Sequence, residues 1–175
     1  MSGEPVTDAE LFTLFEAARW APSSGNSQPW QLFYAHRDSR HWSGFLSVLV
    51  EANRVWCVNA AVLVVLASRT VREGSGRPLG THAYDTGAAW ASLALQGHLS
   101  GLVVHGMAGF DYAAARTLLR LPDEIAVNAM AAIGRPGRLE DLPEPLRVRE
   151  TPSLRKPLAE FVHAGPLPAS SLDIS

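Results

Sequence analysis

An uninterrupted apolar run at residues 61–67 constrains the fold of this chain more than any other feature of its sequence. It reads Ala-Val-Leu-Val-Val-Leu-Ala, so residues on both alternating faces of an extended chain would be apolar. Valine-rich runs of this length are typical of strands that are buried on both faces. We therefore predict that residues 61–67 form a central strand of a sheet.

The remaining pattern mixes strands and helices without strict alternation, which predicts the α+β class. Thr7 and Glu10 have the spacing of a capping box at the start of a first helix. Glycines and a proline predict a surface loop at 71–79. Further strands are predicted at 30–35, 101–107 and 125–133, and helices at 8–21, 42–54, 85–97 and 111–119.

Length and composition predict one domain, residues 1–175, in which 140–175 form an extended, proline-rich C-terminal arm. The apolar-polar segment 158–163 within this arm is expected to add a strand at the sheet edge of a neighbouring subunit. The net charge of −2, without a basic stripe, argues against a nucleic-acid partner. We predict no membrane helix, and the single cysteine, Cys57, favours the cytoplasm.

The most informative polar segment is residues 19–30, which end a helix, form a loop and enter a strand. Ser23, Ser24, Asn26 and Gln28 offer the donors and acceptors that a planar heterocycle with carbonyls and ring nitrogens requires. The same residues also suit a capped helix end followed by a plain turn. Local sequence alone leaves both interpretations open.

The pattern Ala-Pro-Ser-Ser-x-Asn-x-Gln-Pro-Trp in this segment resembles that of the nitroreductase family, and matches elsewhere agree in order and spacing. The resemblance implies a three-layer α+β fold, in which helices flank a mixed, mainly antiparallel sheet. It also implies an intertwined homodimer with exchanged C-terminal arms. The matching segments are 53–56 with 59–60, 84–87, 105–111, and the stretch from Arg149 to His163.

The resemblance implies an FMN site shared between two subunits. One subunit would contribute the loop at 22–28 and the other Asn53, while a backbone N–H of Ala108 or Gly109 would point at the flavin N5. Arg155 would bind the FMN phosphate. The implied cofactor-binding residues are Pro22, Ser23, Ser24, Asn26, Gln28, Asn53, Met107, Ala108, Gly109 and Arg155.

The chain departs from the family pattern at its front. Relatives carry an Arg-Arg-Ser-like stretch about a dozen residues before the first capped helix, whereas this sequence starts at Met1, next to that helix. Three explanations stay open: a start that lies further upstream, weak flavin binding, or loss of flavin. Ser153 stands where the family often has a second cation for the phosphate.

The implied activity is ping-pong hydride transfer from NAD(P)H through FMN to a small acceptor such as a nitroaromatic, quinone or enone. No side-chain acid or base is required, so no catalytic residue is predicted. The alternatives are a catalytically silent flavin-binding or interaction homologue, and a flavin-dependent dehydrogenase of a biosynthetic intermediate. The reductase and the dehydrogenase need the same cofactor site and differ in the substrate pocket.

Other candidate residues receive structural interpretations. The six histidines show no metal-ligand spacing, so no metal site is predicted. Asp85 is interpreted as a helix cap rather than as an acid, and His105 as a structural histidine. The five tryptophans are expected to anchor the core and interfaces.

Overall fold

The computed structural model describes residues 1–142, 144–148 and 150–167. Its chain divides into two units, Met1–Asp141 and a smaller one that begins at Leu142. The predicted boundary of the C-terminal arm at residue 140 lies next to this division. That the whole chain forms one domain stays a prediction.

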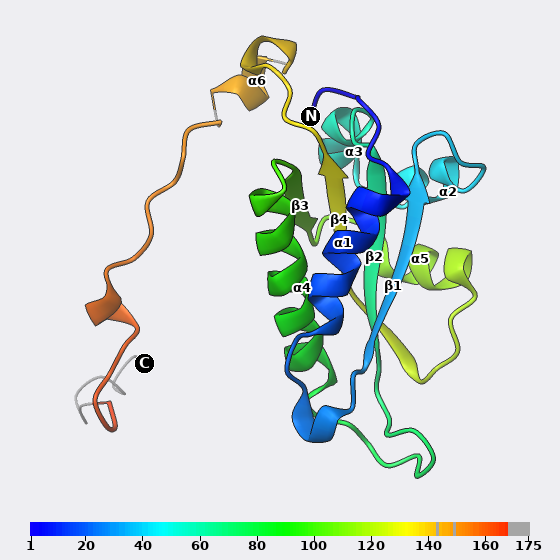
Figure 1. Ribbon diagram of the computed structural model, residues 1–175, viewed down its shortest axis with the longest axis vertical. Coiled ribbons are helices and arrows are strands. Elements are labelled where there is room, and N and C mark those ends of the chain that lie inside the picture. Colours follow the sequence, from blue (N-terminus) through cyan, green and yellow to red (C-terminus); the bar gives the residue numbers. More distant parts are fainter. Residues whose placement is uncertain (143, 149, 168–175) are drawn as a thin grey trace. The chain divides into compact units, whose positions relative to one another are not determined.

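The first unit contains a four-stranded antiparallel sheet with the order β1-β2-β4-β3 (Figure 1). β2 is buried along almost its whole length, which confirms the prediction of a central strand. Every described strand pair is antiparallel, so the expected mixed character of the sheet is not found in this part of the chain. The strands are β1 (Trp30–His36), β2 (Val62–Arg69), β3 (Val103–Met107) and β4 (Ile125–Gly134).

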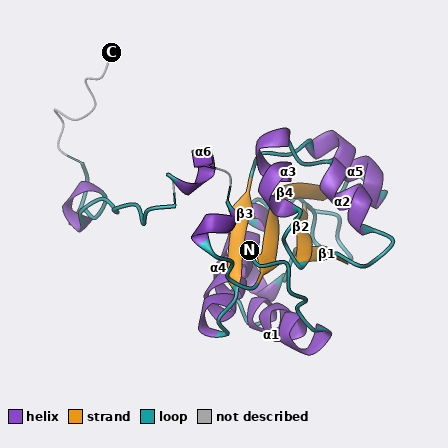
Figure 2. Cartoon of the chain, turned by 90° about the horizontal axis from the view of Figure 1, so that it is seen from above, coloured by secondary structure: helices purple, strands orange, loops and turns teal. Residues whose placement is uncertain are grey.

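Helices cover both faces of this sheet, as Figure 2 shows. α1 and α4 pack on the face that carries Val62 and Val64, whereas α2, α3 and α5 pack on the face that carries Leu63 and Val65. The alternation follows from the two-residue period of a strand. The predicted three-layer α+β architecture is therefore confirmed. The helices are α1 (Asp8–Arg19), α2 (Trp42–Ser47), α3 (Glu51–Cys57), α4 (His82–Leu99) and α5 (Tyr112–Leu119).

The start of α1 confirms the predicted capping box. The Thr7 hydroxyl accepts a hydrogen bond from the Glu10 N–H, and the Glu10 carboxylate accepts one from the Thr7 N–H at 2.9 Å. The Arg135 guanidinium donates to the same carboxylate at 2.7 Å. The Thr7 N–H, and then Arg135, lower the pKa of Glu10 to about 2. The first turn of α1 is thus joined to Arg135, the residue that follows β4.

The single helix predicted at 42–54 is wrong, because the chain breaks into α2 and α3. Val50 between them is extended, with φ −63° and ψ 153°. Leu49 forms an isolated antiparallel bridge with Phe110, and the Val50 N–H donates to the Gly109 carbonyl at 3.1 Å. Tertiary pairing with the segment after β3 therefore overrides a helical pattern that looks continuous in the sequence.

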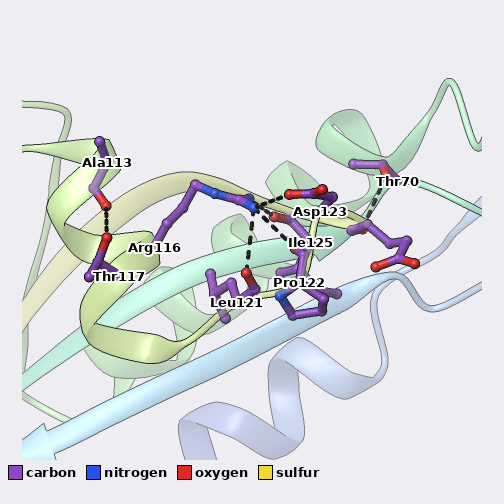
Figure 3. Close-up of polar contacts among 9 residues, drawn as sticks. Thr70, Ala113, Arg116, Thr117, Leu121, Pro122, Asp123 and Ile125 are labelled. Carbon is purple, nitrogen blue, oxygen red and sulfur yellow. Dashed lines mark hydrogen bonds and ion pairs between the residues drawn. The ribbon is translucent and has the colours of Figure 1, made fainter.

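Arg116 on α5 fixes the turn that leads into β4 (Figure 3). Its guanidinium donates to the Ile125 carbonyl, to the Pro122 carbonyl at 3.2 Å and to the Asp123 carboxylate at 3.2 Å. Asp111 caps the same helix, as predicted, by accepting from the Ala114 N–H at 2.9 Å. The Arg116 guanidinium therefore has a structural role, because it holds the turn between α5 and β4.

The described part of the second unit contains two short elements, α6 (Glu144–Arg147) and a 3-10 turn at Leu158–Glu160. The strand expected at 158–163 is thus not formed within this chain, because an edge strand needs the backbone partners of another strand. Exchange of this arm between subunits stays a prediction. Arg149, which belongs to the family-like segment, lies outside the described residues.

Candidate functional site

The loop after α1 has an unusual backbone. Gly25, Asn26 and Gln28 have φ values of 56°, 50° and 44°. Side chains disfavour this left-handed region, so the loop depends on tertiary contacts to keep its shape. Within the loop, the Ser23 hydroxyl accepts a hydrogen bond from the Gln28 N–H at 3.0 Å. Ser24, Asn26 and Gln28 are exposed.

A buried carboxylate fastens this loop to α4. Asp85 is 3% exposed and accepts hydrogen bonds from the Ser24 N–H at 3.2 Å and from the Thr81 hydroxyl at 2.9 Å. The interpretation of Asp85 as a helix cap is therefore wrong, because α4 starts at His82 and Asp85 already lies inside it. Its role is to position the Ser23–Gln28 segment, and the family-like match at 84–87 was the only signal of that role.

A second polar network lies near the start of α4, and the sequence analysis missed it. The fully buried Ser68 hydroxyl lies 2.7 Å from His82 Nδ1 and accepts from Asn128 Nδ2 at 2.8 Å. Asn128 occupies a bulge in β4, where the register with β2 shifts. These three residues are distant in sequence, so no local pattern could have identified them.

On the other face of the sheet, Asn53 lies against Gly109. Asn53 Nδ2 donates to the Gly109 carbonyl at 2.9 Å. A Cβ added at Gly109 would lie 2.6 Å from the same nitrogen, so a side chain at this position would displace the Asn53 amide. The structure thus brings together two of the predicted flavin-binding positions, which are 56 residues apart in the chain.

The loop after β3 presents two unused backbone donors. Pairing with β4 stops at Met107, and the Phe110 N–H turns back to the Ala108 carbonyl at 3.1 Å. Within residues 1–142, 144–148 and 150–167, the N–H groups of Ala108 and Gly109 donate to no protein acceptor. Because the Ala108 carbonyl accepts from the Phe110 N–H, the peptide plane that carries the Gly109 N–H is held in direction. Such groups suit an acceptor atom that gains negative charge.

The predicted site residues therefore fall into separate groups. Ser23, Ser24, Asn26 and Gln28 lie with Asp85 on the layer of α1 and α4, whereas Asn53 lies with 107–109 on the layer of α3. No hydrogen bond joins the two groups in the described part of the chain. Arg155 lies in the second unit, where its guanidinium donates to the Ser153 carbonyl at 3.0 Å and hydroxyl at 2.8 Å. Contact of all these residues with flavin stays a prediction.

Aromatic residues near the second group have packing roles. The rings of His105 and Trp56 lie 4.7 Å apart between centroids, which supports the structural interpretation of His105. Trp30 and Trp90 pack on the core under α1 and α4, and Trp42 and Trp56 pack on the opposite core. Packing is therefore confirmed for these four tryptophans.

Cys57 lies beneath the same group and is expected to be unreactive. It is fully buried, its sulfur lies 3.5 Å from the Met107 sulfur, and burial raises the pKa of its thiol to about 12. Because the thiolate is the reactive form, a disulfide reagent at pH 8 should label no thiol in the native protein and one per chain in denaturant. Rapid labelling of the native protein would contradict this burial.

The described residues contain no group of three or more His, Cys, Asp or Glu side chains placed to hold a metal ion. They also contain no helix long and apolar enough to cross a membrane.

Known sequences that are similar to this chain match part of it. A family model described as "Nitroreductase family" matches residues 2–52. A Streptomyces coelicolor protein named "Putative NADH dehydrogenase/NAD(P)H nitroreductase" is 41% identical over 63 residues, which are 36% of this chain and 31% of that protein. The match thus spans less than a third of that curated relative.

Solved structures extend the similarity to almost the whole chain. One described as an oxidoreductase containing FMN is 41% identical, covers 95% of this chain and 86% of that chain, and has a TM-score of 0.91. A Desulfovibrio desulfuricans nitroreductase in complex with FMN is 23% identical, covers 94% and 88%, and has a TM-score of 0.71. The second likeness concerns the fold alone.

Proposed function

This chain belongs to the nitroreductase family, and on that premise we propose that it is an FMN-dependent oxidoreductase. It would transfer hydride from NAD(P)H by way of FMN to a small acceptor such as a nitroaromatic, quinone or enone, in a ping-pong cycle. Two of the similar solved structures are described as containing FMN, and the curated relative's name includes NAD(P)H. Both facts support the proposal.

The observation that carries the proposal is the pair of unused N–H groups at Ala108 and Gly109. Backbone donors without a protein acceptor among the described residues are suited to stabilising charge that develops on a bound group. FMN, when bound, supplies the hydride chemistry. Asn53 has a second N–H and a carbonyl oxygen in its amide, which suit the polar edge of the same heterocycle. No side-chain acid or base is needed in this arrangement.

We further propose a homodimer in which each flavin is held by both subunits. The separation of the two residue groups supports this arrangement, since neither group alone surrounds a ligand. An apolar stripe on α4 supplies a surface for association, because Tyr84, Leu95 and Leu99 are 82%, 66% and 79% exposed. Exposed apolar patches of this kind mark association sites more often than plain surface.

The proposal is tested by the visible absorption spectrum of the purified protein, before and after addition of FMN and removal of the excess by gel filtration. We expect flavin bands equivalent to about one FMN per subunit. Oxidation of NADH and NADPH, with a quinone and a nitroaromatic as acceptors, is then measured on the same sample.

The possible results separate the competing functions. Retained flavin with nucleotide oxidation supports the enzyme. Retained flavin with neither nucleotide oxidised supports a catalytically silent homologue. Oxidation of NADH or NADPH without reduction of the quinone or the nitroaromatic favours a dehydrogenase of another substrate class. A protein that does not retain FMN contradicts the proposed cofactor.

A further inference from the structure

A cavity of about 260 Å³ lies beside the polar loop, between it and the segment that joins β2 to α4. Asn26 and Ser27 line it from the loop, Arg69 lines it from the end of β2, and Arg72 and Ser75 line it from the joining segment. The cavity therefore shares Asn26 with the proposed flavin-binding loop, and its other lining residues lie outside the proposed flavin-binding set. Its lining is rich in hydrogen-bond donors.

The joining segment is held as a short hairpin rather than as a loose loop. At its base, the Thr70 N–H and hydroxyl donate to the Glu124 carbonyl at 2.7 and 3.0 Å, close to the Arg116 network in Figure 3. The Arg72 N–H donates to the Arg77 carbonyl at 2.7 Å, and Val71 forms a bridge with Pro78. The backbone that carries Arg72 is thus fixed beside the cavity.

The charged groups that line the cavity leave one cation unpaired. Arg69 forms an ion pair with Glu73 at 2.9 Å. Arg72 has no carboxylate partner among the residues that the structure describes. Its guanidinium approaches the polar loop, lying 3.4 Å from the position that a Cβ at Gly25 would occupy. The balance of two arginines against one glutamate favours an anionic ligand.

A second, independent observation also points to a ligand. The Ser27 hydroxyl is buried and has no hydrogen-bond partner within the described residues. A buried hydroxyl without a partner is costly, and a ligand atom in the adjacent cavity would satisfy it. A guanidinium, a hydroxyl and the Asn26 amide together match the several acceptor oxygens of a phosphate group.

We propose that this cavity binds the phosphate monoester of a nucleotide, with Arg72 as its main cation and Ser27 as a second donor. The inference rests on the proposed function, which offers two such groups: the 2′-phosphate of NADPH, and the 5′-phosphate of FMN, for which the family resemblance instead implies Arg155. Binding of the former would make the enzyme prefer NADPH over NADH. Binding of the latter would strengthen retention of FMN relative to riboflavin.

The test compares Arg72→Gln with Arg77→Gln, a control in the same hairpin whose side chain does not line the cavity. Dissociation constants are measured calorimetrically for adenosine 2′,5′-bisphosphate and FMN, with 5′-AMP and riboflavin as comparison ligands. Because a charge-assisted hydrogen bond is lost, we expect about a 10- to 100-fold weakening of one phosphate ligand in Arg72→Gln. Arg77→Gln should change neither constant more than about threefold.

The results identify the source of the phosphate. Weakening confined to adenosine 2′,5′-bisphosphate, with a matching loss of kcat/KM for NADPH but not NADH, assigns the cavity to NADPH. Weakening confined to FMN, with riboflavin unchanged, assigns it to the cofactor. If Arg72→Gln matches Arg77→Gln for both ligands, the proposal is overturned. Binding of adenosine 2′,5′-bisphosphate needs no turnover, so this result is distinct from failure of the proposed enzyme activity.

Discussion

Replacing Leu95 and Leu99 together by glutamate is expected to convert the protein to monomers and to abolish FMN retention. Both side chains lie on the exposed apolar stripe of α4, where they are 66% and 79% exposed in the single chain. Burying a leucine contributes about 1.5–3 kcal/mol, and burying an unpaired carboxylate opposes association further. The dissociation constant of the dimer should therefore rise by at least about 100-fold.

Light scattering after gel filtration measures this change, and absorbance in the same run reports the flavin. Leu118→Glu is the matched control, because Leu118 is 39% exposed on α5, in the opposite layer. Circular dichroism should show that the double variant remains folded. A double variant that still elutes as a flavin-bearing dimer would exclude α4 as the subunit interface.

Replacing Asp85 by alanine is expected to cost about 2–4 kcal/mol of folding free energy and to weaken FMN binding. The substitution leaves the Ser24 N–H and the Thr81 hydroxyl without their buried acceptor. The loop at 23–28, whose φ values are unfavourable, would then lose its attachment to α4. Asp85→Asn keeps an acceptor oxygen and should have a smaller effect.

Urea denaturation and FMN titration measure the two consequences separately. Asp8→Ala serves as the control, since the Asp8 side chain is 77% exposed and, among the described residues, its ion pair is with His36 at 2.8 Å. Its loss should cost less than about 1 kcal/mol. Equal stability of Asp85→Ala and Asp8→Ala would show that the buried carboxylate does not hold the loop.

The sequence alone was sufficient for features that depend on neighbouring residues. The apolar run at 61–67 identified the central strand, because burial on both faces leaves no polar alternation. Thr7 and Glu10 located the first helix, because a capping box is a contact between residues three apart. The polar loop at 22–28 was visible because its short hydrogen-bonding side chains follow one another in the chain.

Tertiary structure decided the features that depend on residues far apart in the sequence. The pairing of Leu49 with Phe110 broke the predicted helix, and the register of the sheet placed Asn53 against Gly109. The role of Asp85 likewise depends on the packing of α4 beside the loop, which places its carboxylate against the Ser24 N–H. Local patterns carry propensities, whereas these contacts depend on strand order, register and helix packing, which are fixed only when the whole chain is folded.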